Sequence, residues 1–177
     1  MKEMLQSQML AALETLELCI AGCPEGQWQQ SHGDAPFSQV VFHALFFTDY
    51  YLSDSDEEMK GRQFHRENPA LFRDYEELRW ERPRQTYTKA EILPYCCYCR
   101  QRVADYFTGL DDQALLSQAV RKKMSRLELA LYLIRHIQHH AAQLGLRIQQ
   151  ITGDELKWIA QSAEGRLGSE ISSSYHG

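Results

Sequence analysis

The chain has 177 residues, enough for one well-buried core but too few for two ordinary domains. Its formal net charge of −5 at pH 7 argues against a nucleic-acid-binding protein, because phosphate binding requires a concentrated basic face. No apolar run approaches the about eighteen residues of a membrane span, and the start of the chain shows no signal-peptide pattern. We therefore expect a cytoplasmic protein that contacts neither membrane nor nucleic acid.

The first helix is predicted over residues 3–21, where apolar side chains recur at intervals of three and four residues. It should end before Gly22 and Pro24, and a loop should follow to Gly33. The second helix should start after Asp34, which can cap it, with Pro36 tolerated in the first turn.

The second helix, ending near Leu52, is rich in aromatic residues. Its buried face is marked by apolar and small side chains, namely Phe37, Val40, Val41, Ala44, Thr48 and Tyr51. His43 lies at the edge of this stripe, next to Phe47. Phe42 and Phe46 fall off the predicted core face. They suggest a partner surface such as a homodimer interface, or a surface that the long following connection covers.

That connection opens with an acidic stretch at Ser53 and runs to about Tyr87. Inside it, Asn68 and Pro69 read as the cap and first residue of a short helix through Leu78. A connection this long is unusual in a compact bundle. Two interpretations stay open: it covers the mouth of a functional site, or it only pads the bundle.

Two further helices begin with capping boxes, Thr88-x-x-Glu91 and Ser125-x-x-Glu128. The last helix should stop at Gly153. The basic run 121–123, just before it, reads as a solvated loop.

A short helix is predicted over 154–163, around Leu156, Trp158 and Ile159. We expect one domain over residues 1–163 and a flexible tail over 164–177, which is rich in serine and glycine. The predicted fold class is all-α, a four-helix bundle with a long connection between helices 2 and 3.

Five cysteines, an odd number, make a poor disulfide framework and suit a reducing compartment. Cys96, Cys97 and Cys99 crowd together and could in principle hold a soft metal. On a helix, however, Cys96 and Cys97 point about 100° apart, which favours ordinary core and edge cysteines.

The most informative stretch is a run of histidines in the last helix. His136 and His140 are four residues apart, so both imidazoles can reach one metal ion, whereas His139 projects into solvent. A third ligand must come from another helix, and His43 lies at an equivalent flanking position. Three imidazoles suit zinc and nickel alike. A metalloprotease is not expected, because Ile137 follows His136 where that motif has a glutamate.

These motifs resemble a known family. A histidine in an aromatic second helix, an aspartate six residues later at Asp49, and a late helix reading H-x-x-H-H-x-x-Q-L are similar to the DinB/YfiT-like superfamily. The resemblance implies a four-helix bundle with a three-histidine divalent metal site, commonly dimeric, with some members acting on low-molecular-weight thiols. Its metal ligands carry over to His43, His136 and His140. The Arg-Gly pair often found after the histidines is replaced by Ala141-Ala142.

Two functions therefore stay open. The first is a divalent-metal-dependent enzyme of the thiol transferase or hydrolase type, whose catalytic residues the sequence does not name. Asp49 and Tyr50 lie near His43 in sequence, but Asp49 projects away from it, so a structural or dimer-facing role is at least as well supported. The alternative is a non-catalytic metal-binding or structural helical bundle. Either is expected to be a homodimer.

Overall fold

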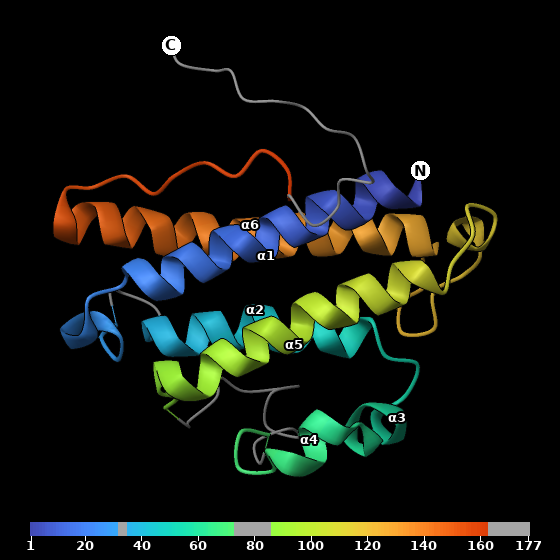
Figure 1. The fold of residues 1–177 in the computed structure, drawn as a ribbon, viewed down its shortest axis with the longest axis horizontal. Coiled ribbons are helices and arrows are strands. Elements are labelled where there is room, and N and C mark those ends of the chain that lie inside the picture. The colour runs from blue at the N-terminus through green and yellow to red at the C-terminus, as the bar shows by residue number, and fades with distance from the viewer. Residues whose placement is uncertain (32–34, 73–85, 163–177) are drawn as a thin grey trace, which may run out of the picture.

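The computed structural model describes residues 1–31, 35–72 and 86–162. Within these ranges the chain is helical, and four long helices lie side by side (Figure 1). They are α1 (Lys2–Gly22), α2 (Phe37–Tyr51), α5 (Lys89–Thr108) and α6 (Arg126–Thr152). The shorter elements are η1 (Glu25–Gln27), α3 (Asp56–Gly61), α4 (Gln63–Glu67) and η3 (Ala114–Leu116). The predicted all-α fold is confirmed.

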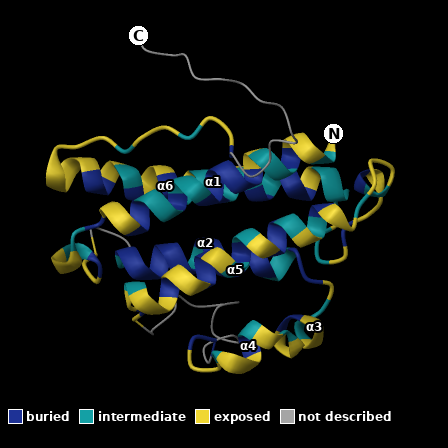
Figure 2. Ribbon diagram, viewed as in Figure 1, coloured by how far each residue is buried: buried dark blue, intermediate teal, exposed yellow. Residues whose placement is uncertain are grey.

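Each long helix packs against two others: α1 and α2 both contact α5 and α6. The apolar stripes of the four helices therefore face one shared core, seen as the dark blue surfaces in Figure 2. Its fully buried side chains include Met9, Leu13, Leu16, Val41, Leu45, Cys99, Val103, Leu133, Ile137 and Leu144. Each such side chain stabilises the fold by about 1.5–3 kcal/mol relative to exposure. This core holds α2 and α6 in the register on which the site depends.

Local signals account for the helix ends. Both capping boxes form: the Thr88 hydroxyl accepts from the Glu91 amide, and the Ser125 hydroxyl from the Glu128 amide. At the other end of α6, Gly153 has φ 81°, the left-handed conformation that glycine adopts without strain. Pro36 directly precedes the first residue of α2, while the predicted cap of that helix lies outside the described residues.

The long connection contains two helices that we did not predict, α3 and α4. Ser55 caps α3 by accepting from the Glu58 amide. The predicted helix starting at Asn68 is wrong over residues 68–72, because Asn68 ends α4 and its side chain donates to the Phe64 carbonyl at 2.9 Å. The rest of that predicted helix lies outside the described residues. Elements of five or six residues have too little periodicity to be recognised and depend on tertiary contacts.

The described part of the connection packs on Phe42 of α2, one of the two aromatic residues for which we left open a partner surface or cover by the connection. Phe42 and Phe46 are 0% and 2% exposed, so the expectation that they face a partner is wrong. The Phe42 ring stacks on Tyr87 at 4.1 Å between centroids and also contacts Phe72 and Tyr95. The chain's own connection, together with α5, therefore occupies this surface.

Residues 154–162 are not helical, contrary to our prediction. The segment runs back along α6, where the Ala160 carbonyl accepts from the Gln8 side chain at 3.1 Å (Figure 1). Leu156 packs near Gly22 and Gly145, whereas Trp158 is 72% exposed. Three apolar residues in so short a segment do not offset the cost of starting a helix. The predicted tail over 164–177 lies outside the described residues.

None of the described helices is long and apolar enough to cross a membrane. All five cysteines are free, and Cys96 and Cys99 are buried while Cys97 is exposed. Burial raises the pKa of the Cys96 thiol to about 12, so it stays protonated. The interpretation of the cysteine trio as core and edge residues is confirmed.

Candidate metal centre

The structure brings together the three histidines that the sequence singled out. His43 comes from the middle of α2, and His136 and His140 come from successive turns of α6, which packs against α2. One nitrogen of each ring lies within 4.8 Å of the others. His139 is exposed and is not part of this group. Helical phase alone thus predicted which of the neighbouring histidines converge.

The spacing of the nitrogens fits a divalent ion. Nε2 of His43 lies 3.3 Å from Nε2 of His136. Two imidazole nitrogens bound to one tetrahedral ion at about 2.05 Å would lie about 3.3 Å apart. In the metal-free protein one of these two nitrogens can carry the proton and donate to the other, and a bound cation would accept both lone pairs in place of that hydrogen bond.

The protonation states also suit a metal. Burial, with a smaller contribution from the neighbouring His140, lowers the pKa of His43 to about 4. Burial and the same histidine cluster lower the pKa of His136 to about 3, and burial lowers that of His140 as well. All three rings are therefore neutral near pH 7, and no proton must be displaced before they bind a cation.

Gln143, which we named only as part of the family motif, orients the ring of His140. Nδ1 of His140 donates to Oε1 of Gln143 at 2.9 Å, which leaves the lone pair on Nε2. His136 has no such orienting partner: its Nδ1 is buried without a hydrogen bond to the described part of the protein. The spacing of Gln143, three residues after His140, was a readable signal for this contact.

Aromatic rings form the walls of the group. The Phe47 ring lies 4.7 Å from that of His43, and Tyr132 lies parallel to His136 at 6.0 Å. The ion pairs found in the described ranges include none from a carboxylate to His43, His136 or His140. The site is thus apolar, with three neutral donors and no negative charge of its own.

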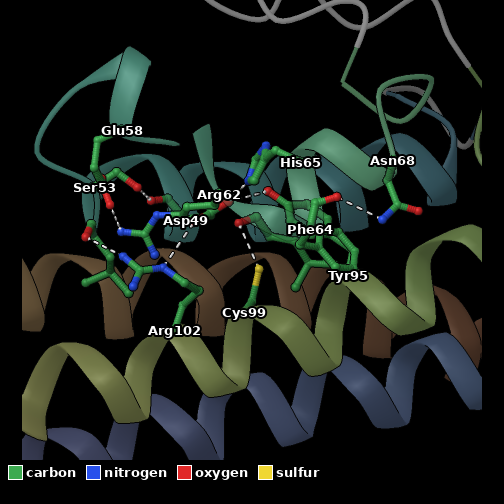
Figure 3. Close-up of polar contacts among 12 residues, drawn as sticks. Asp49, Ser53, Glu58, Arg62, Phe64, His65, Asn68, Tyr95, Cys99 and Arg102 are labelled. Carbon is green, nitrogen blue, oxygen red and sulfur yellow. Dashed lines mark hydrogen bonds and ion pairs between the residues drawn. The ribbon is translucent and has the colours of Figure 1, made fainter. Parts of the chain in front are cut away.

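Asp49, the carboxylate nearest to His43 in the sequence motif, contacts residues of α4 and α5 instead (Figure 3). It is fully buried, and its Oδ2 accepts from Nε2 of His65 at 2.6 Å and from the Tyr95 hydroxyl at 3.4 Å. Its Oδ1 lies 3.6 Å from Nε of Arg102. This arrangement ties α4 and α5 to α2, so Asp49 has a structural role and does not serve the histidine group as a base.

We predicted that the basic run 121–123 before α6 is a solvated loop, and this is wrong for Arg121 and Lys122. Arg121 lies 4.0 Å over the ring of Tyr50 and donates to Asp56 at 2.8 Å and to the Ser53 carbonyl at 2.7 Å. Only Lys123 is exposed. For a cation, contacts with a carboxylate and with an aromatic face offset the hydration free energy that is lost on burial. Sequence reasoning missed these contacts because they join segments far apart in the chain.

Lys122 is the second cation that departs from the prediction. Its Nζ lies 4.7 Å from the centre of the Tyr51 ring and 4.3 Å from that of Tyr132. It is half-buried, between one tyrosine of α2 and one of α6. Tyr132 thus contacts both the charged group of Lys122 and the ring of His136.

A comparison of the sequence with protein-family models matches residues 5–144 to the DinB superfamily. The match includes all three histidines, the whole of α2, and α6 as far as Leu144. Searches of curated proteins and of solved structures gave no match. Because the family model covers well over half of the sequence, the chain belongs to the DinB superfamily.

Proposed function

We propose that this protein is a divalent-metal-dependent enzyme of the thiol transferase or hydrolase type, with the metal bound by His43, His136 and His140. The observation that carries the proposal is the convergence of three neutral imidazoles within 4.8 Å. Zinc and nickel suit this donor set equally. The DinB family is associated with metals, which supports the same assignment.

Three protein donors leave coordination positions open for a substrate. A divalent ion in such a site acts as a Lewis acid and lowers the pKa of a water or thiol that it binds. The protein's own groups would hold and orient this centre. Gln143 keeps the Nε2 lone pair of His140 available, and Phe47 and Tyr132 exclude water from two sides.

The test begins with protein purified without a histidine tag and without chelator. We expect about one zinc or nickel ion per chain by elemental analysis. Thiol-transfer and ester-hydrolysis assays should then show activity that is lost with chelator and restored by adding the ion back. A protein that lacks the ion after dialysis against each metal would contradict the proposal at its first step.

The alternative is a non-catalytic metal-binding bundle. One observation favours it: the groups that contact the three rings in the described ranges are aromatic rings and the Gln143 amide, and none is a carboxylate that could act as a base. Full metal occupancy with no turnover in either assay would support this alternative.

We also propose that the protein is a homodimer, that it is cytoplasmic and that residues 1–163 form one domain. The buried Phe42 and Phe46 no longer support a dimer, whose remaining support is the family resemblance. Five free cysteines support a reducing compartment. Sedimentation that shows only a species near 20.6 kDa would exclude the dimer.

A further inference from the structure

A divalent ion bound by His43, His136 and His140 would have no carboxylate beside it, within the described ranges, to neutralise its charge. With three neutral imidazoles, a bound divalent ion would keep its full charge of two. The described ion pairs bring no carboxylate to these rings. A site of this kind attracts anionic ligands, because burial strengthens uncompensated charge.

Lys122 adds a further positive charge beside the aromatic rings that contact the histidines. Its ammonium group lies over Tyr132, and the Tyr132 ring lies parallel to that of His136 at 6.0 Å and 9°. From α2, Tyr51 contacts Tyr132 at 5.8 Å and Phe47 at 5.7 Å. Aromatic rings from both α2 and α6 therefore form an unbroken series of contacts from Lys122 to the histidine group.

Arg121 and Lys122, which are neighbours in the loop, differ in whether a carboxylate neutralises their charge. Arg121 is paired with Asp56 and with a backbone carbonyl, which accounts for its position structurally. The ion pairs of the described ranges give Lys122 no carboxylate; its contacts are with Tyr51 and Tyr132. Burial disfavours the charge on Lys122, yet hydrogen bonding to these two hydroxyls outweighs it and raises the pKa. The ammonium is charged and has capacity left to bind an anion.

We propose that Lys122, with the hydroxyls of Tyr51 and Tyr132, forms a second subsite that binds a carboxylate group of a ligand whose other end reaches the metal. This inference rests on the proposed metal centre. Nζ of Lys122 lies 4.3 Å from the centre of the Tyr132 ring, and that ring lies 6.0 Å from the ring of His136, so the ammonium is at most about 10 Å from His136, a span that a short ligand bound at both ends can bridge. One lysine and two hydroxyls match a single negative charge, whereas a phosphate dianion is more often bound by arginine or by several cations.

The test uses the full-length protein loaded with cobalt, whose visible spectrum reports thiolate binding. Two probes are compared: 3-mercaptopropionate, which carries a carboxylate, and 3-mercapto-1-propanol, which carries a hydroxyl in its place. The measured quantity is the ratio of the two affinities. We expect the wild-type protein to favour the carboxylate probe, and we expect this preference to fall with added salt.

Lys122→Met removes the charge while its side chain keeps its contact with the rings. We expect it to lower the affinity ratio about tenfold, the effect of losing a hydrogen bond to a charged group, and to abolish its salt dependence. Tyr132→Phe should lower the ratio by a smaller factor. The matched control is Lys123→Met, which removes an adjacent exposed charge and should leave the ratio unchanged.

The outcomes separate the two proposals. A cobalt spectrum with an equal ratio in wild type and Lys122→Met would overturn the subsite and leave the metal centre intact. An equal fall in ratio for Lys122→Met and Lys123→Met would overturn it as well, because only general charge would then matter. Failure of the wild-type protein to bind cobalt, zinc or nickel would overturn the metal centre and the subsite together.

Discussion

Two histidine environments lie against different faces of helix α2, one buried and one half-buried, and they differ in whether a carboxylate is present. On the face toward α4 and α5, His65 contacts the carboxylate of Asp49 at 2.6 Å, and Arg102 lies on the other oxygen (Figure 3). On the face toward α6, His43 meets two further imidazoles and no carboxylate. The first group is complete within the protein. The second has three nitrogen donors and no carboxylate, which supports the proposal that it binds a cation.

His65, a structural histidine, differs from the three candidate metal ligands in the groups that contact its ring. His65 is 4% exposed, stacks on Phe72 at 4.0 Å and has a buried acid. One nitrogen of each of His43, His136 and His140 lies within 4.8 Å of the others, and the ion pairs of the described ranges bring no carboxylate to them.

Replacing Asp49 with alanine should destabilise the fold most. The change leaves Arg102 and His65 buried without their carboxylate, and breaking a buried ion pair costs about 3–5 kcal/mol. Urea unfolding measures this loss of unfolding free energy. The exposed Asp105→Ala on α5 is the control and should change stability by less than about 0.5 kcal/mol. If Asp49→Ala instead lost its metal while keeping its stability, the division between the two groups would be wrong.

Removing one of the three converging histidines should abolish stoichiometric metal binding. We expect His136→Ala to lose the metal and His139→Ala, its exposed neighbour, to keep it. Metal bound only to the native state at a free concentration of about 100 times Kd stabilises the protein by about 2.7 kcal/mol. Chelator should therefore lower the Tm of the wild type and leave that of His136→Ala unchanged. Equal metal loss in both variants by elemental analysis would refute the assignment by helical phase.

Replacing Gln143 with leucine should weaken metal binding without abolishing it. The substitution removes the acceptor that fixes the His140 ring, and losing such a partner costs roughly 10–100-fold in affinity. Competition with a chromogenic chelator measures the change. Gln138→Leu on the same helix is the matched control. An unaltered affinity in Gln143→Leu would show that the ring needs no orienting contact.

The metal-free protein should lose stability in acid. The folded pKa of His43 is about 4, below its ordinary value near 6.5, so the unfolded chain binds more protons between these values. Stability is full above about pH 6.5 and declines as pH falls toward 4, by at most about 1.4 kcal/mol per pH unit for this group. His43→Gln should flatten that slope in chelator-treated protein, and His139→Gln should not. A slope that is the same in His43→Gln and wild type would contradict the burial argument.

The sequence alone predicted those features that depend on short-range patterns. Thr88 and Ser125 start α5 and α6 because a capping box lies within four residues, and Gly153 ends α6 because only its own backbone conformation matters. The spacing of His136 and His140 on one helix face is equally local. The phase of His43 on α2 then required only that the two helices be neighbours.

Only the tertiary structure decided the features that depend on contacts between distant segments. Phe42 is buried because Tyr87, forty-five positions later, returns to cover it, and Asp49 finds its partners on α4 and α5. Lys122 is drawn from solvent by two tyrosines on different helices. Periodicity reports which side of its own helix a residue occupies, whereas the balance of a buried charge depends on groups that no local pattern records.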